Sequence, residues 1–175
     1  KLHTAILADL QGPKIRVGEL KKPIKLKKGA EVIFSTKKKK DTIYINYKRL
    51  AKDVQFKDRV LLDDGKLVLE VVSTNMKDEV ILKVIFGGLL HSRKGVNLPN
   101  TKISLPCLTQ KDKKDLAFIL AEKIEWIGLS FVRSVNDVES LKKVINKHKS
   151  HHKVIAKIEK PEAIKDIDAI IGAAD

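Results

Sequence analysis

The sequence contains few of the residues that mark secreted, membrane-spanning or base-stacking proteins. Cys107 is its one cysteine, so no disulfide can form within the chain, and we expect a reducing, cytoplasmic environment. No apolar run reaches the roughly 18 to 20 residues of a membrane span. We expect no signal peptide, although Lys1 is not a natural start residue. Aromatic residues make up only 5% of the chain, which argues against stacking on nucleic-acid bases.

Positive charge is the most unusual feature that the sequence does have. Lysine and arginine number 36 against 22 acidic residues, which gives a net charge of +14. A basic surface attracts anions such as nucleic acid, acidic lipid or phosphorylated metabolites. The 175 residues with 43% hydrophobic content are enough to bury a core, as one large or two small domains.

Two kinds of hydrophobic pattern divide the chain. Between about residues 17 and 98, short segments of alternating apolar and polar residues are separated by turns, which predicts an all-β barrel or sandwich. Asp64-Gly65 lies between two apolar runs and is a strong hairpin signal. Beyond residue 98, helical patterns alternate with apolar strands at 126–132 and 154–158. This order, α-β-α-β-α, predicts a parallel sheet covered by helices.

Three helix starts are visible in the second part. Thr109 with Asp112 resembles a capping box, Ser134 with Asp137 repeats the pattern, and Pro161 suits a first helical position. The apolar face of the third helix contains Ile164, Ile167, Ile170 and Ile171. With a strand at the start of the chain, the sheet has three strands, too few for a closed barrel of eight. We therefore expect a piece of a longer protein.

The stretch from Ala5 to Arg16 connects the two parts. Its apolar run ends in Asp9, Gly12-Pro13 breaks the run, and Lys14 and Arg16 follow at once. This pattern predicts a buried strand that carries a carboxylate and two cations to one place before the chain changes direction. We interpret the stretch as a hinge between the β part and the α/β part.

Charged residues also follow the later strands. The active site of a parallel α/β protein lies at the carboxyl ends of its strands. Ser130 and Arg133 end the second strand, and Lys157 and Glu159 end the third. In an extended chain, residues two apart point the same way. The carboxylate can bind Mg²⁺, and the ammonium can neutralise charge on a transferring phosphoryl group. An ordinary ion pair explains the pattern equally well.

Six motifs in order resemble the pyruvate kinase family. They are A-D-L-Q-G-P-K-I-R-V-G at 8–18, L-L-D-D-G at 61–65, R-K-G-V-N-L-P at 93–99, L-T-Q-K-D-K-K-D-L at 108–116, S-F-V-R at 130–133 and K-I-E-K-P-E-A at 157–163. The resemblance implies a partial TIM barrel, strands 3 to 5 of eight, carrying an inserted small β-barrel domain. Residues 1–12 would be barrel strand 3, residues 13–98 the mobile lid, and residues 99–175 helix 3 to helix 5.

The resemblance also implies a reaction, in which phosphoenolpyruvate and ADP give pyruvate and ATP with Mg²⁺ or Mn²⁺. Lys157 matches the residue that stabilises phosphoryl transfer, and Glu159 matches a Mg²⁺ ligand. Arg16 and Lys94 match residues that contact nucleotide phosphates. Asp63-Asp64 would lie where the lid approaches the barrel on closure, although the hairpin turn already explains that pair.

One departure from the common family pattern concerns K⁺. Many members have Glu at the position of Lys14 and use K⁺ beside the substrate. Members with Lys there usually also carry the residue types of Leu10, Gln11 and Val17, and this chain has all of them. A tethered ammonium near Asp9 can replace a mobile cation. The resemblance therefore implies that Lys14 replaces K⁺ and that K⁺ is not required.

The resemblance places the family's second Mg²⁺-binding Asp, its proton-donating Thr and a substrate Arg outside this chain. We therefore expect the 175 residues alone to be inactive. The resemblance also implies that the parent enzyme is a homotetramer.

Two other functions remain open. A metal-dependent aldolase or lyase barrel would not explain the inserted β domain. A basic β-barrel that binds RNA would lose affinity steeply with salt, and the low aromatic content disfavours it.

Overall fold

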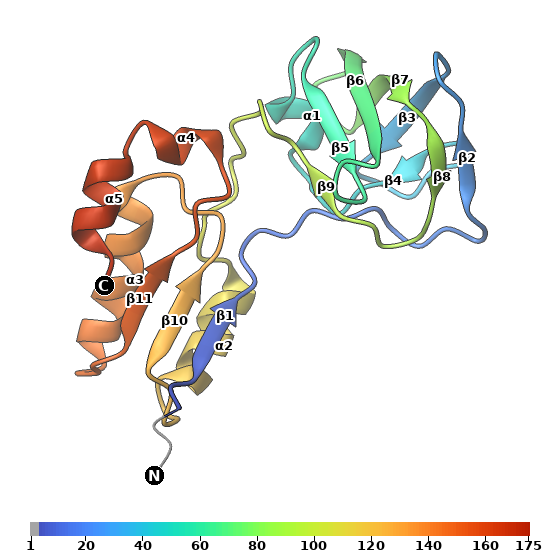
Figure 1. The fold of residues 1–175 in the computed structure, drawn as a ribbon. Coiled ribbons are helices and arrows are strands. Elements are labelled where there is room, and N and C mark those ends of the chain that lie inside the picture. Colours follow the sequence, from blue (N-terminus) through green and yellow to red (C-terminus); the bar gives the residue numbers. More distant parts are fainter. Residues whose placement is uncertain (1–3) are drawn as a thin grey trace. The chain divides into compact units, whose positions relative to one another are not determined.

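The computed structural model describes residues 4–175 and divides them into two compact units (Figure 1). Unit 1 consists of the described residues up to Pro13 together with Leu105–Asp175, and unit 2 is Lys14–Ser104. From the sequence we placed the divisions after residues 12 and 98. The second division falls later because residues 101 to 104 bond within unit 2. Thr101, for example, donates a hydrogen bond to Asp58 over 2.7 Å.

A three-stranded parallel sheet forms the centre of unit 1, in the order β1-β10-β11. The strands are β1 (Leu7–Leu10), β10 (Trp126–Leu129) and β11 (Lys153–Ala156). Leu10 pairs with Leu129, and Leu129 pairs with Ala156. The three strands therefore end at the same level, and the residues that follow them share one edge of the sheet. The sequence predicted such a parallel sheet.

Four helices accompany this sheet. They are α2 (Gln110–Ile119), α3 (Val135–Lys147), α4 (Pro161–Ile164) and α5 (Ile167–Ala173). The predicted capping box of Thr109 and Asp112 is present at the start of α2. At α3, Ser134 is the N-cap residue, but its side chain does not cap the helix. There Asp137 accepts a hydrogen bond from the backbone N–H of Arg133 at 3.0 Å instead.

The prediction of one continuous helix after Pro161 is wrong. The chain leaves the helical conformation at Asp166, whose carboxylate accepts a 2.7 Å hydrogen bond from the backbone N–H of Val135. This bond to the start of α3 separates α4 from α5. Of the predicted apolar face, Ile170 is buried, whereas Ile164 and Ile171 are 63% and 67% exposed.

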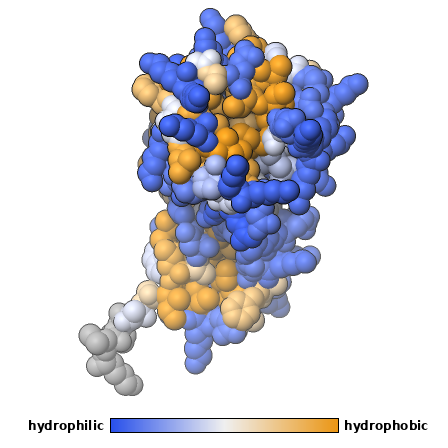
Figure 2. Space-filling model, turned by 90° about the vertical axis from the view of Figure 1, so that its right-hand side faces the viewer, coloured by the Kyte–Doolittle hydropathy of each residue, from blue (hydrophilic) through white to orange (hydrophobic). Residues whose placement is uncertain are grey.

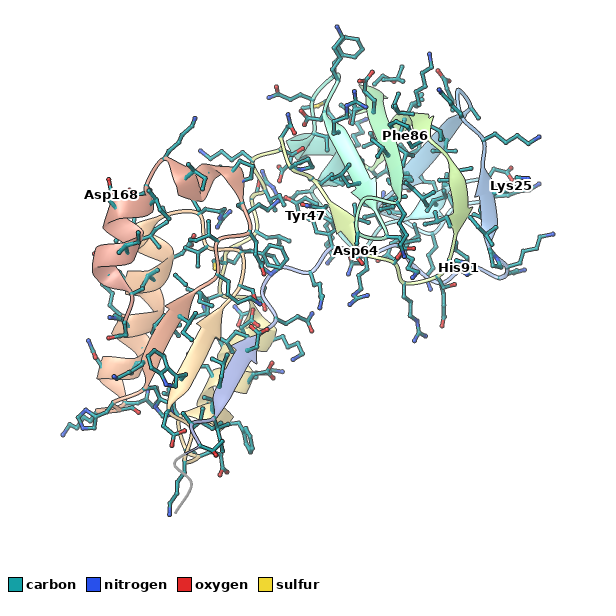
Figure 3. All side chains as sticks on the ribbon, in the orientation of Figure 1. Lys25, Tyr47, Asp64, Phe86, His91 and Asp168 are labelled. Carbon is teal, nitrogen blue, oxygen red and sulfur yellow. The ribbon has the colours of Figure 1, made fainter. Side chains whose placement is uncertain are left out.

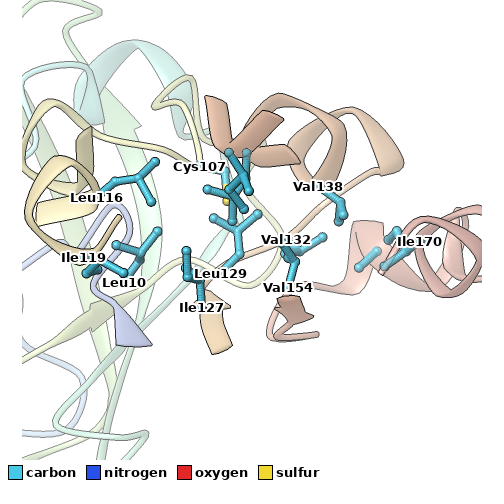
Figure 4. Packing of buried hydrophobic residues seen from close by; sticks show 13 residues of the cluster. Leu10, Cys107, Leu116, Ile119, Ile127, Leu129, Val132, Val138, Val154 and Ile170 are labelled. Carbon is cyan, nitrogen blue, oxygen red and sulfur yellow. The ribbon is translucent and has the colours of Figure 1, made fainter. Parts of the chain in front are cut away.

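The core of unit 1 joins the strands to their helices. Buried residues of the strands pack with Leu116 and Ile119 of α2, Val138 of α3 and Ile170 of α5 (Figure 4). The strand residues of this cluster are Leu10, Ile127, Leu129 and Val154. Burial of each such side chain contributes roughly 1.5–3 kcal/mol. The core fixes the strand ends, and hence the edge at which the charged residues lie.

Unit 2 consists of β-sheets with one short helix, α1 (Leu50–Asp53). A curled six-stranded sheet has the order β4-β3-β7-β6-β5-β9, and β2 pairs with β8 (Figure 1). The strands are β2 (Ile24–Leu26), β3 (Glu31–Ser35), β4 (Ile43–Tyr44), β5 (Arg59–Leu62), β6 (Leu67–Thr74), β7 (Glu79–Phe86), β8 (Gly88–Leu90) and β9 (Val96–Asn97). The predicted hairpin at Asp64-Gly65 joins β5 to β6.

Residues 46 to 53 bond to both ends of unit 2. The side-chain amide of Asn46 donates a hydrogen bond to the carbonyl of Lys14 at 3.4 Å. The neighbouring Tyr47, labelled in Figure 3, donates to Asp53. The backbone N–H of Ser104 donates to the Tyr47 hydroxyl at 3.0 Å and to Asp53 at 2.9 Å. Burial and the bond to Asp53 raise the pKa of Tyr47 to about 12.

The face shown in Figure 2 has both hydrophilic and hydrophobic areas. In unit 1, Ile6 and Leu7 are 53% and 51% exposed, and in unit 2, Phe86 and Leu89 are 61% and 52% exposed. None of the helices within residues 4–175 has the length and apolar character needed to cross a membrane.

Candidate active site

Lys157 joins residues from all three strand ends of unit 1. Its Nζ lies 3.0 Å from both carboxylate oxygens of Asp9, which is on β1. It lies 2.9 Å from Oγ of Ser130, directly after β10, and 3.4 Å from Oε1 of Glu159. The structure therefore brings together three predicted site residues, Asp9, Lys157 and Glu159, and adds Ser130.

The backbone after β11 explains this position. β11 ends at Ala156, two residues earlier than the predicted strand. The chain nevertheless stays beside β10, because the N–H of Lys157 donates to the carbonyl of Leu129 at 3.0 Å. The carbonyl of Lys157 accepts from the N–H of Val132 at 3.3 Å. The ion pair of Lys157 and Glu159 confirms that these side chains project together.

The carboxylates keep Lys157 charged. Partial burial lowers the pKa of its ammonium, but hydrogen bonding to Asp9 and the charge of Glu159 outweigh this, so the pKa rises above its ordinary value of 10.5. Because the folded-state pKa is raised, the stability from these contacts is present below about pH 10.5. It is lost as the pH rises through the folded-state pKa.

Glu159 is held by a strained turn. Its Oε2 accepts a 3.1 Å hydrogen bond from the backbone N–H of Phe131. Phe131 has a φ of 58°, in the left-handed region that bulky residues seldom adopt. The strain is a cost that the surrounding structure offsets, and it directs this N–H at the carboxylate. Glu159 therefore has a fixed place at the edge of the sheet, and its side chain remains 36% exposed.

The donor set at this edge suits a hard cation that keeps most of its water. Mg²⁺ prefers oxygen ligands and is often held by one or two carboxylates rather than by a full protein cage. The partly exposed carboxylate of Glu159 fits this requirement. Within residues 4–175, no group of three or more His, Cys, Asp or Glu side chains is arranged to hold a metal ion.

Ser130 is a site residue to which the sequence assigned no role. Its hydroxyl donates to the carbonyl of Leu10 at 2.7 Å and accepts from Lys157. The thiol of Cys107 donates to the carbonyl of Ser130 at 2.9 Å. Burial raises the pKa of that thiol to about 12, so Cys107 stays protonated at neutral pH. The only sequence signal for Ser130 was its place at a strand end.

Gly12 packs closely against the turn after β10. Its φ is +65°, and a Cβ at this position would lie 2.8 Å from Cδ2 of Phe131 and 3.2 Å from Cβ of Ser130. Both the backbone conformation and the space therefore require glycine. The local structure thus explains the glycine of the Gly12-Pro13 pair in the first motif.

Most of the remaining predicted residues lie in unit 2. Asp63 pairs with Lys94 at 2.9 Å. Arg16 donates from Nη1 to the carbonyl of Arg93 at 2.7 Å. The backbone of Asp63 also donates to the carbonyl of Gly95, which bridges to Arg16. In unit 2, Arg16 and Asp63 therefore both bond to the segment of residues 93–95, which contains Lys94.

Three predicted residues have less defined roles. Asp64, labelled in Figure 3, is exposed in the β5–β6 turn with a φ of 57°. Leu10 is buried in the core of unit 1, so only its carbonyl is part of the site. Lys14 is the first residue of unit 2 and is exposed.

Charged side chains at the aligned carboxyl ends of parallel strands, with helices packed on the sheet, are the arrangement of an α/β enzyme. Comparison with known proteins specifies the family. The family model described as the pyruvate kinase barrel domain matches residues 1–175. The chain therefore belongs to the pyruvate kinase family.

Individual relatives agree with this assignment. The chain is 44% identical to a pyruvate kinase of Corynebacterium efficiens over 97% of its own length and 36% of that protein. It is 41% identical to one of Mycobacterium tuberculosis, over 97% of the chain and 37% of the relative. It is 38% identical to one of Thermococcus litoralis, over 99% and 37%. The chain thus spans about a third of the length of these curated relatives.

The close packing at Gly12 predicts opposite effects of two glycine substitutions. Gly12→Ala would place a Cβ against Phe131 in a left-handed conformation, and we expect a loss of more than about 1 kcal/mol in unfolding free energy. Gly172→Ala, in α5 where a Cβ would meet nothing, is expected to stabilise by roughly 0.5–1 kcal/mol. Urea unfolding of both variants measures the difference. Equal effects would contradict the packing at Gly12.

Proposed function

We propose that the protein containing this chain transfers the phosphoryl group of phosphoenolpyruvate to ADP, giving pyruvate and ATP. The observation that carries the proposal is the ammonium of Lys157, held by Asp9, Ser130 and Glu159 at the edge where parallel strands end. The relatives that match the chain over nearly its whole length are pyruvate kinases. The family assignment leaves the aldolase and RNA-binding alternatives without support.

We also propose an architecture for the two units. Unit 1 would belong to a TIM barrel, with β1, β10 and β11 as its third, fourth and fifth strands. Unit 2 would be the small β domain inserted after the third strand. The parallel order β1-β10-β11, with the β unit between the first two of these strands in the sequence, supports this assignment.

Lys157 would perform the central electrostatic task. Negative charge develops on the oxygens of a transferring phosphoryl group and of the enolate that it leaves. A fixed ammonium can stabilise that charge without reorganising during the reaction. Its raised pKa keeps Lys157 protonated, and Asp9 holds the ammonium through both carboxylate oxygens. Substrate oxygens would share this ammonium with Asp9.

Glu159 would hold Mg²⁺ or Mn²⁺, and the cation would supply further charge neutralisation on the phosphoryl oxygens. The bond from the N–H of Phe131 to Oε2 orients the carboxylate. The other oxygen faces Lys157. A second carboxylate from outside these residues would complete the protein ligands.

Arg16 and Lys94 of unit 2 would contact nucleotide phosphates. Lys94 lies on the segment of residues 93–95, to which Arg16 and Asp63 both bond. A nucleotide would therefore compete with Asp63 for the ammonium of Lys94. Asp63 and Asp64 would lie at the end of unit 2 that moves on closure. Closure would exclude water and protect the phosphoryl group from hydrolysis.

The role of Lys157 can be tested by coupled detection of pyruvate in the intact protein that contains this chain. Lys157→Met removes the ammonium, and we expect turnover to fall by at least about 100-fold. Lys153→Met is the matched control, because Lys153 lies at the other end of β11 and stacks on Trp126. Full activity of Lys157→Met would refute the proposed role. The same assay on residues 1–175 alone should detect no pyruvate, and turnover there would overturn our expectation of inactivity.

The metal proposal predicts a response to chelation. Removal of divalent ions with EDTA should abolish pyruvate formation, and Mg²⁺ or Mn²⁺ should restore it. Glu159→Gln weakens the oxygen ligand, and we expect the Mg²⁺ concentration for half-maximal activity to rise about tenfold or more. Glu139→Gln, on α3, is the control. An unchanged Mg²⁺ requirement in Glu159→Gln would show that Glu159 is not the ligand.

We propose that the ammonium of Lys14 replaces K⁺. This proposal predicts activity without K⁺. The intact protein should turn over in buffer free of Na⁺ and K⁺, and added K⁺ should change the rate less than about twofold. Lys14→Glu replaces the tethered ammonium by a carboxylate and should make the activity K⁺-dependent. Activation of the unmodified protein several-fold by K⁺ would contradict the proposal.

The homotetrameric assembly and the cytoplasmic location stay predictions from the sequence. Light scattering of the intact protein would measure its assembly, and a mass other than that of four chains would refute the homotetramer.

A further inference from the structure

Asp112 is a fully buried carboxylate with two separate tasks. Its exposed fraction is 0%. One oxygen, Oδ2, accepts from the backbone N–H of Thr109 at 2.9 Å and from the Thr109 hydroxyl at 2.5 Å, which completes the capping box of α2. The other oxygen, Oδ1, accepts from the backbone N–H of Gly12 at 3.1 Å. Capping accounts for the first set of bonds and leaves the second unexplained.

The bond to Gly12 connects α2 to the loop that leaves β1. Gly12 and Asp112 are 100 residues apart in the sequence, so the bond is a tertiary contact. A buried N–H without a partner is costly, so the Asp112 oxygen determines where this loop can lie. The left-handed φ of Gly12 gives its N–H the direction that the bond requires.

The same loop lies against the residues that hold Lys157. A Cβ on Gly12 would be 3.2 Å from Cβ of Ser130 and 3.3 Å from its carbonyl oxygen. Two residues earlier, the carbonyl of Leu10 accepts the hydroxyl of Ser130 at 2.7 Å. Ser130 in turn accepts from the ammonium of Lys157. The contacts therefore run from Asp112 through Gly12 and Ser130 to Lys157.

We propose that Asp112 is a positioning residue for the phosphoryl-transfer reaction. It fixes the loop of residues 10–13 against Ser130, and so sets the distance between Asp9 and the Lys157 ammonium. This inference rests on the proposed function. Asp112 does not touch the reacting groups, and its effect is through the geometry of the groups that do.

Two substitutions separate positioning from helix capping. Asp112→Asn keeps the size of the side chain but replaces one acceptor oxygen by a donor NH₂, which cannot bond to an N–H group. The retained oxygen is expected to face Thr109, where it accepts two bonds, so the NH₂ faces the N–H of Gly12 and the Gly12 bond is lost. Thr109→Ala removes the capping hydroxyl and leaves the Gly12 bond in place. It is the matched control for any weakening of α2.

The experiment uses the intact protein and two readouts. Hydrogen exchange of the Gly12 amide should be at least about tenfold faster in Asp112→Asn and unchanged in Thr109→Ala. With phosphoenolpyruvate and ADP, kcat should fall on the order of tenfold in Asp112→Asn, because small displacements at a reacting centre are costly. The KM for phosphoenolpyruvate should change less, and Thr109→Ala should keep both constants.

Three results would overturn the inference. They are unchanged exchange at Gly12 in Asp112→Asn, faster exchange with an unchanged kcat, and an equal loss of kcat in Thr109→Ala. If Asp112→Asn does not fold, glycolic acid in place of Gly12 deletes only the backbone N–H and must give the same loss of kcat. An unmodified protein without pyruvate kinase activity would refute the proposed function instead, so the two failures are distinct.

Discussion

The ammonium of Lys157 bonds to Asp9 on β1, to Ser130 directly after β10 and to Glu159 beyond the end of β11. It can do so because the register of the sheet ends β1, β10 and β11 at one level, with the hydrophobic core fixing the strands behind it. Lys157 forms ion pairs with both Asp9 and Glu159. Without it, both carboxylate oxygens of Asp9 would lose the ammonium from which they accept, so the arrangement of the site depends on this cation.

Much of this site followed from sequence patterns that have a strong physical cause. Helical and strand periodicities of the second part predicted a parallel sheet, and residues at its strand ends were expected to meet. Lys157 and Glu159 were expected to point the same way because residues two apart in an extended chain do so, and the two side chains form an ion pair. The hairpin at Asp64-Gly65 was equally clear, because few residues tolerate a left-handed turn.

Other features depend on contacts that no local pattern encodes. The helix after Pro161 is broken because Asp166 bonds to Val135, on another helix. Ser130 has its place through partners on β1 and directly after β11, far away in the sequence. The boundary of unit 2 was set too early because bonds of residues 101 to 104 to that unit have no sequence signature.

The bonds of residues 46 and 47 have a consequence for how this protein can change. Lys14 and Ser104, the first and last residues of unit 2, bond to the adjacent residues Asn46 and Tyr47. The entry and exit points of the unit are therefore neighbours, tied together by bonds that lie wholly within it. A compact unit whose ends lie side by side can gain, lose or exchange residues without altering β1 and β10, the parallel strands that precede and follow it in the sequence.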